Sequence, residues 1–116
     1  MMRRGDIVLI DCDPARPGEV DKRRPAVLVS NDGANSAAAR LGRGVVTVVP
    51  VTSNVTRIHP FQVMLPADLT GLHRDSKAQA EQVRSVAVHR IGPQLGRVPA
   101  GLMSELDDSL RLHLSL

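Results

Sequence analysis

The residues best suited to chemistry lie beside two predicted strand ends. Glu19 and Arg24 share a charged loop, and Arg24 directly precedes Pro25, which opens an apolar run. Because a proline restricts the preceding residue to extended backbone, we expect the Arg24 side chain to be presented at a defined strand end. Thr52 begins a second polar cluster, Thr52-Ser53-Asn54, after a valine-rich run. If the two strand ends are neighbours, Arg24, Glu19 and Thr52 converge on one pocket.

An arginine beside a hydroxyl and a carboxylate suits phosphoryl chemistry. In such reactions the protein mainly positions the reacting atoms and neutralises the charge on oxygen atoms. The guanidinium group offers a planar fork of donors that matches a phosphate. The spacing of these residues alone, however, favours the simpler interpretation of a charged hairpin loop followed by a strand-ending threonine. A functional assignment therefore needs more than this spacing.

The sequence lacks the patterns of metal and nucleotide sites. The single Cys12 has no partner for an intrachain disulfide or a cysteine zinc site. Gly42 and Gly44 are not followed by the Gly-Lys-Ser/Thr of a phosphate-binding loop. The histidines share no ligand spacing and are expected at surface or loop positions: His59, His73, His89 and His113. We therefore expect no metal and no cofactor.

Composition predicts a single globular domain spanning residues 1–116, since compact domains are typically about 100–150 residues long. Arg and Lys exceed Asp and Glu by fifteen to twelve, giving a net charge of +3 that permits a nucleic-acid partner without showing one. With one Phe and no Tyr or Trp, the core must be aliphatic and base stacking on Tyr or Trp is excluded. The first apolar run, Ile7 to Ile10, is too short for a signal peptide or a membrane span, so we expect a cytoplasmic protein.

Short β-branched and apolar runs predict strands over residues 7–10, 25–30, 45–51 and 61–65. Pro50 within the third run indicates an edge position, a bulge or a strand end. Residues 33–41 fit a short surface helix or an irregular excursion. Residues 76–89 are ambiguous, because they carry good helix formers without a clean helical stripe.

The C-terminal segment predicts an amphipathic helix that docks on a sheet. Val98-Pro99 places a proline at its first turn. Apolar residues then recur at helical spacing on one face: Leu102, Met103, Leu106, Leu110 and Leu114. The whole pattern indicates a small β-rich barrel or sandwich covered by a terminal helix.

An ordered set of segments resembles the MazF/PemK family of toxin endoribonucleases. It begins at Arg4-Gly5-Asp6-Ile7 and continues through Gly18-Glu19 and the segment from Arg24 to Asp32. The later matching segments are Pro50 to Ser53, Phe61 to Leu65, Asp75-Ser76, Glu81 to Ser85 and Gly96 to Val98. Each piece alone is weak, but their order and spacing over nearly the whole chain are specific.

The resemblance implies an SH3-like barrel of the CcdB/Kid/MazF kind with a C-terminal helix, assembled as a twofold homodimer. It also implies that Ser76 to Val86 is strand rather than helix. The implied activity is metal-independent, sequence-specific cleavage of single-stranded mRNA, in which the ribose 2′-hydroxyl attacks the adjacent phosphate. The products are a 2′,3′-cyclic phosphate and a 5′-hydroxyl. A cognate MazE-like antitoxin would neutralise the toxin.

Carried onto this sequence, the family's catalytic residues match Arg24, Thr52 and the acidic loop residue Glu19. Arg24 would contact the scissile phosphate, chiefly as an electrostatic stabiliser, because a guanidinium stays protonated. Thr52 would hydrogen-bond the same phosphate, and Glu19 would act as a base or organise its loop. Further RNA contacts are expected from the polar residues nearby and in the later matching segment: Lys22, Arg23, Ser53, Asn54 and Gln82.

Two alternatives keep this fold but change the function. One is a gyrase-poisoning toxin resembling CcdB, in which a Trp-Gly-Ile-like C-terminus is typical. This chain instead ends Leu112-His113-Leu114-Ser115-Leu116, without tryptophan. The other is a catalytically inactive binding module, against which the presence of both Arg24 and Thr52 argues.

Overall fold

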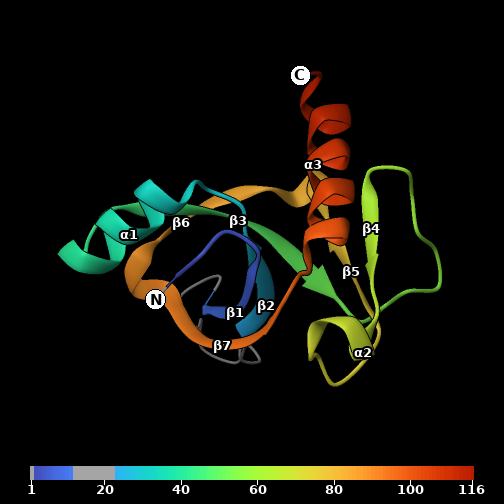
Figure 1. Ribbon diagram of the computed structural model, residues 1–116, viewed down its shortest axis with the longest axis horizontal. Coiled ribbons are helices and arrows are strands. Elements are labelled where there is room, and N and C mark those ends of the chain that lie inside the picture. Colours follow the sequence, from blue (N-terminus) through green and yellow to red (C-terminus); the bar gives the residue numbers. More distant parts are fainter. Residues whose placement is uncertain (1, 12–22) are drawn as a thin grey trace, which may run out of the picture.

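The computed structural model describes residues 2–11 and 23–116, which form a curled antiparallel sheet with helices around it (Figure 1). The strands are β1 (Asp6–Asp11), β2 (Arg23–Leu28), β3 (Val45–Thr52), β4 (Gln62–Leu65), β5 (Ser76–Gln79), β6 (Arg84–Ala87) and β7 (Ile91–Arg97). The helices are α1 (Asp32–Leu41), α2 (Ala67–Thr70) and α3 (Ala100–Leu114), with short 3-10 turns η1 (Ala80–Gln82) and η2 (Val88–Arg90).

The strand order is β4-β5-β3-β2-β1-β7, and β6 pairs with the first half of β3. The sheet thus divides at β3, whose residues 45–48 pair with β6 and whose residues 51–52 pair with β5. β6 leads into β7 through η2, but within the described part of the chain no ladder joins these two strands, so the barrel stays open. The predicted mainly-β class with a C-terminal helix is confirmed.

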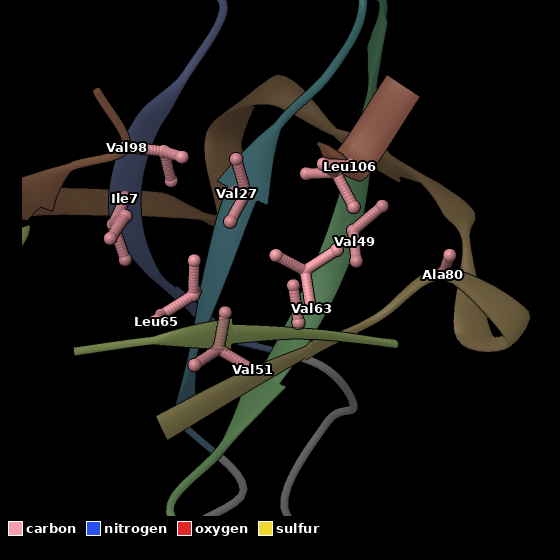
Figure 2. Packing of buried hydrophobic residues seen from close by; sticks show 10 residues of the cluster. Ile7, Val27, Val49, Val51, Val63, Leu65, Ala80, Val98 and Leu106 are labelled. Atoms are coloured by element: carbon pink, nitrogen blue, oxygen red, sulfur yellow. The ribbon is translucent and has the colours of Figure 1, made fainter. Parts of the chain in front are cut away.

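Two aliphatic clusters fill the two faces of the central strands. Side chains alternate between faces along a strand, so that Val27 lies in one cluster while Ala26 and Leu28 lie in the other. Figure 2 shows the first cluster, where β-strand valines meet Leu65 of β4 and Leu106 of α3. Neither cluster contains an aromatic side chain, as the composition predicts.

The helix α3 docks through its first three turns only. Leu106 is fully buried, and Leu102, Met103 and Leu110 pack against the same cluster. The prediction that Leu114 belongs to this docking face was wrong, because Leu114 is 49% exposed. The last turn extends beyond the sheet (Figure 1), which removes the surface that would cover it. Pro99 is the N-cap of this helix, one residue before its first turn.

Within the ambiguous segment 76–89, residues 76–79 and 84–87 are the strands β5 and β6, as the resemblance implies for Ser76 to Val86. The 3-10 turn η1 separates the two strands, and residues 88 and 89 begin the second 3-10 turn, η2. Ala78 and Ala80 are fully buried in the first cluster, so tertiary packing overrides the helix propensity of this segment. Residues 33–41 lie in the helix α1, which is capped by the Asn31 side chain and ends at Gly42 in the left-handed conformation.

Pro50 is not at a sheet edge, because β3 is flanked by β2 on one side and by β6 and β5 on the other. It lies two residues from the strand end, between the residues that pair with β6 and those that pair with β5. This break between two partner strands is a place where a missing N–H is tolerated.

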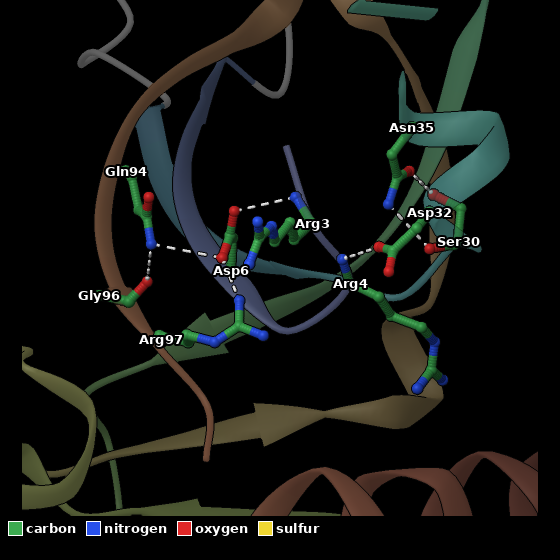
Figure 3. Close-up of polar contacts among 9 residues, drawn as sticks. All are labelled: Arg3, Arg4, Asp6, Ser30, Asp32, Asn35, Gln94, Gly96 and Arg97. Carbon is green, nitrogen blue, oxygen red and sulfur yellow. Dashed lines mark hydrogen bonds and ion pairs between the residues drawn. The ribbon is translucent and has the colours of Figure 1, made fainter. Parts of the chain in front are cut away.

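A polar network around the buried Asp6 and the adjoining turn fixes the start of β1 (Figure 3). The Asp6 carboxylate accepts hydrogen bonds from the Arg97 guanidinium at 2.5 Å and from the Arg3 backbone N–H at 2.9 Å. The backbone N–H of Arg4 donates to Asp32 at 2.7 Å, and its guanidinium binds Asp107 of α3. The N-terminal turn is therefore tied to β7, α1 and α3.

Candidate active site

Arg24 and Thr52 are brought to neighbouring strand ends by the β2–β3 ladder. Its outermost pair is Ala26 with Pro50, and Arg24 and Thr52 each lie two residues beyond that pair, at the same end of the two strands. Arg24 shares a face with Ala26, and Thr52 shares a face with Pro50, because side chains alternate along each strand. The two side chains therefore extend from the same face of the sheet.

The Arg24 side chain is exposed and makes no hydrogen bond or ion pair within the described part of the chain. Its backbone is fixed by pairing with Ile10 of β1. A strand-anchored guanidinium without an internal carboxylate partner leaves its donors available to an anion such as a phosphate. This availability, more than the residue type, distinguishes Arg24 from the arginines of the network at β1.

The hydroxyl of Thr52 is oriented by the turn that follows it. Thr52 Oγ1 accepts the backbone N–H of Asn54 at 3.2 Å, and Asn54 Oδ1 accepts the backbone N–H of Thr56 at 3.3 Å. With one lone pair of each oxygen engaged, the hydroxyl proton of Thr52 and the amide N–H groups of Asn54 remain free to donate to a ligand. Ser53 is exposed between them.

Lys77 is a cationic neighbour of Thr52 that the sequence did not indicate. It pairs with Thr52 in the β3–β5 ladder, so the two side chains share a face. Lys77 is only 8% exposed, and its Nζ donates to the backbone oxygen of Arg57 at 2.6 Å. This bond fastens the loop that follows Thr52. The position of Lys77 beside Thr52 follows only from the β3–β5 register, because local propensity did not assign residues 76–89 to a helix or a strand.

Of the other predicted site residues, the structure describes Arg23 and Gln82. Arg23 is exposed and is the first residue of β2, where it lies opposite Asp11 in the β1–β2 strand register. Gln82 is exposed at the end of η1, and no hydrogen bond links it to Arg24 or Thr52 among the described residues. Glu19 and Lys22 lie outside the described residues, as do Cys12 and the rest of the charged loop. The roles of all these residues stay predictions.

Comparisons with known proteins identify the family. Residues 3–114 match the family described as "PemK-like, MazF-like toxin of type II toxin-antitoxin system". The chain is 59% identical to "Endoribonuclease MazF9" of Mycobacterium tuberculosis, over all of this chain and 98% of that protein. It is 33% identical to "Endoribonuclease MazF2" of Mycobacterium bovis, over all of this chain and 99% of the relative.

Solved structures agree with this. One of the MazE–MazF structures from Deinococcus radiodurans has a TM-score of 0.79 at 29% identity, covering 99% of this chain and 96% of that one. A mycobacterial endoribonuclease in complex with its cognate antitoxin has a TM-score of 0.76 at 21% identity, which shows the fold alone, and covers all of this chain and 97% of that one.

The open, curled sheet with its C-terminal helix is therefore the fold of the MazF toxins. The chain belongs to the PemK-like, MazF-like family of toxins of type II toxin–antitoxin systems and is an endoribonuclease of that family. The predicted family and enzyme class are confirmed. No helix among the described residues is long and apolar enough to cross a membrane.

Proposed function

We propose that this chain is a sequence-specific endoribonuclease that cleaves single-stranded mRNA without a metal ion and is neutralised by a cognate antitoxin. The observation that carries the proposal is the position of the Arg24 guanidinium, which has no hydrogen-bond or ion-pair partner among the described residues, at the same end of the β2–β3 pair as the oriented Thr52 hydroxyl. This pair combines a fixed positive charge with a neutral donor on two adjacent strands. Such preorganised donors stabilise charge that develops on oxygen in a transition state.

In the proposed reaction the ribose 2′-oxygen attacks the neighbouring phosphorus while the bond to the 5′-oxygen breaks. The 2′-hydroxyl loses its proton to a base, and the leaving 5′-oxygen gains one. The products are a 2′,3′-cyclic phosphate and a 5′-hydroxyl. Arg24 binds the non-bridging oxygens, whose negative charge grows in the transition state, and Thr52 donates a hydrogen bond to the same phosphate.

Glu19 serves as the base or organises the loop that carries Lys22 and Arg23. RNA flanking the cleaved bond is held by Arg23 and Lys22, by the polar turn of Ser53 and Asn54, and by Gln82. Since Asn54 and Gln82 carry amide groups, they can hydrogen-bond the edges of bases as well as phosphates.

Residues 1–116 are proposed to form one toxin domain, which acts in the cytoplasm as a homodimer. Support for an antitoxin comes from relatives: the structures from Deinococcus radiodurans contain MazE with MazF, and the mycobacterial endoribonuclease was solved with its cognate antitoxin. A MazE-like partner of this chain would cover the surface around Arg24 and so exclude RNA.

The decisive experiment is to incubate the purified, antitoxin-free protein with a long single-stranded RNA in EDTA and to map both ends of every product. We expect discrete cuts with 5′-hydroxyl and 2′,3′-cyclic phosphate ends, and protection of an RNA that carries 2′-deoxyribose at the cut. Arg40→Ala, at an exposed arginine of α1, is the matched control for Arg24→Ala and should cut normally.

Intact RNA from folded wild-type protein would contradict the proposal. Gyrase–DNA cleavage complexes on expression would then support the CcdB-like alternative, and their absence an inactive binding module. Cleavage that requires a divalent ion, or that leaves 5′-phosphate ends, would overturn the chemistry while leaving the ribonuclease class intact.

A further inference from the structure

The loop between β3 and β4 directly follows Thr52 and has little packing of its own. It forms a wide excursion beside β4 (Figure 1), and residues 53–60 belong to no helix or strand. None of these residues is buried. Segments with few buried contacts and exposed hydrogen bonds open locally at a low cost in free energy. The turn that orients the Thr52 hydroxyl therefore needs an anchor from elsewhere in the fold.

Lys77 of β5 provides this anchor. Its Nζ donates to the backbone oxygen of Arg57 at 2.6 Å. Within the described part of the chain, this is the one hydrogen bond that joins residues 53–57 to another segment. The far end of the loop is held separately, because Gln62 Oε1 accepts the backbone N–H of His59 at 3.1 Å. The half of the loop next to Thr52 thus depends on Lys77, and the half next to β4 depends on Gln62.

The surroundings of Lys77 are unusual for a lysine. The residue is only 8% exposed, whereas lysines are almost never buried unless they are paired. Among the described residues it has no carboxylate partner, and the Arg57 carbonyl oxygen is its one hydrogen-bond acceptor. A buried ammonium group with a single acceptor gains much from keeping that contact, because a buried charge without a partner is costly. The contact between Lys77 and the loop is therefore expected to persist in solution.

The bond to Arg57 closes a ring that contains Thr52. Lys77 lies opposite Thr52 in the β3–β5 ladder, so the strand pairing fixes one end of segment 52–57 and the Lys77 ammonium fixes the other. Inside the ring, Thr52 Oγ1 accepts the backbone N–H of Asn54 at 3.2 Å, and Asn54 Oδ1 accepts that of Thr56 at 3.3 Å. Both bonds are long and lie in an exposed segment. The ring therefore keeps the Thr52 hydroxyl in one orientation.

We propose that Lys77 is a positioning residue of the ribonuclease: by holding the Arg57 carbonyl, it keeps the turn after β3 closed and so presents the Thr52 hydroxyl to the scissile phosphate. Lys77 acts through this turn and not on the RNA itself. The inference rests on the proposed ribonuclease activity and on the role of Thr52 in it. Because the effect passes through Thr52, a substitution of Lys77 should slow cleavage only while the Thr52 hydroxyl is present.

A double-mutant cycle on the full-length protein tests this dependence. Lys77→Met keeps an unbranched side chain of similar length but cannot donate a hydrogen bond. We expect it to slow single-turnover cleavage roughly ten-fold at saturating protein, since misplacing a group by about 1 Å can cost up to about 100-fold in rate. In the Thr52→Val background, the same substitution should slow cleavage less than about two-fold. A direct contact with RNA, or a general effect on stability, would cost the same factor in both backgrounds.

Gln62→Met is the matched control. Gln62 is also 8% exposed and anchors the same loop, but at the end next to β4, and its Nε2 donates to Glu81 at 2.7 Å. The variant loses both bonds, so it should lower the melting temperature at least as much as Lys77→Met does. Its cleavage rate per folded molecule should equal that of the wild type. An equal loss of rate in both variants would mean that the reaction needs the whole loop, which would overturn the assignment to Lys77.

A measurement on the wild-type protein checks the hydrogen bond itself. Lys22 and Lys77 are the only two lysines of the chain, so the ammonium signals of ¹⁵N-lysine-labelled protein are simple to assign by NMR spectroscopy. The protons of an exposed ammonium group exchange with water too fast to be seen near neutral pH. We therefore expect one visible ammonium signal, absent from Lys77→Met. Absence of this signal from the wild type would refute the proposed bond, whether or not the variant folds.

The cleavage rates separate this inference from the proposed function. A wild-type rate in Lys77→Met, or a full ten-fold loss in the Thr52→Val background, would refute the positioning role and leave the ribonuclease proposal standing. Failure of the wild-type protein to cut any RNA would refute the proposed function, and this inference with it. A wild-type rate in Thr52→Val would remove Thr52 from the reaction, and the role of Lys77 with it, while leaving the ribonuclease class intact.

Discussion

Two groups of arginines in this molecule have opposite surroundings. Arg97 and Arg4 are each bonded to a carboxylate, Asp6 and Asp107 respectively, and so tie the N-terminal turn to β7 and α3. Arg24 is also anchored on a strand, but among the described residues it has no hydrogen-bond or ion-pair partner. The guanidinium groups of Arg97 and Arg4 stabilise the fold, whereas that of Arg24 is available to bind an anionic ligand.

The difference shows that residue type alone does not separate a structural cation from a functional one. An arginine whose donors already bind a carboxylate has little to offer a phosphate, while one presented unpaired beside an oriented hydroxyl can bind it. We therefore expect substitutions at Arg24 to slow cleavage without changing stability. Substitutions around Asp6 should lower stability without changing the cleavage rate.

The largest expected effect is that of Arg24→Ala on catalysis. Removing one preorganised donor to a developing oxyanion costs about 10²–10³ in rate, and we expect this loss in single-turnover cleavage. Because Arg24 is exposed, the free energy of unfolding should change by no more than about 0.5 kcal/mol. Cleavage by Arg24→Ala at the wild-type rate would show that Arg24 is not part of the active site.

Asp6→Ala should produce the opposite result. Asp6 is 4% exposed and accepts bonds from Arg97, Gln94 and the Arg3 backbone, and the variant removes all three bonds. We expect a loss of about 2–3 kcal/mol in the free energy of unfolding, measured by urea denaturation, discounted because the Arg97 side chain is half exposed. The cleavage rate per folded molecule should be unchanged. A fall in this rate would contradict the distinction between the structural arginines and Arg24.

Thr52→Val should slow cleavage by roughly ten- to a hundred-fold, the equivalent of one hydrogen bond to a charged group. Valine keeps the shape of threonine but cannot donate to the phosphate. Thr52→Ser restores the hydroxyl and should recover most of the rate, which separates loss of the donor from disturbance of the turn at Asn54. Equal rates for the valine and serine variants would show that the hydroxyl is not used.

The smallest effect is expected at the partly exposed ion pair. Arg4 and Asp107 side chains are each about one-third exposed, and pairs of this kind contribute less than about 1 kcal/mol. Asp107→Asn should therefore lower the melting temperature slightly and leave cleavage unchanged. A loss as large as that of Asp6→Ala would mean that α3 depends on this pair more than on the burial of Leu106.

Much of the fold could be predicted from local sequence. Runs of β-branched residues correctly indicated β1 to β4, and the leucine spacing indicated α3. The segment 76–87 could not be assigned from propensity, because its strands depend on the burial of Ala78 and Ala80 against other elements. The strand β7 was not predicted, because two glycines and one proline are unusual in a strand; among the described strands it pairs only with β1.

The candidate site was predictable only in part. Arg24 and Thr52 stand next to apolar runs, so the sequence indicates strand ends, and the pairing of β2 with β3 places both residues at the same end of two adjacent strands. Lys77 belongs to another segment, which the β3–β5 ladder places beside Thr52. No local pattern marks it, because lysines are ordinarily exposed and the propensity of its segment does not assign a strand.

The most direct test of the central claim is a sulfur substitution at the scissile phosphate. Replacing one non-bridging oxygen by sulfur weakens hydrogen bonds to that atom, so wild-type protein should cleave one phosphorothioate diastereomer markedly more slowly than the normal RNA in single-turnover reactions. If Arg24 contacts that oxygen, Arg24→Ala should be slow on both substrates and lose most of the difference between them. An undiminished sulfur effect in Arg24→Ala would show that the scissile phosphate is bound elsewhere, and would contradict the assignment of these two strand ends as the active site.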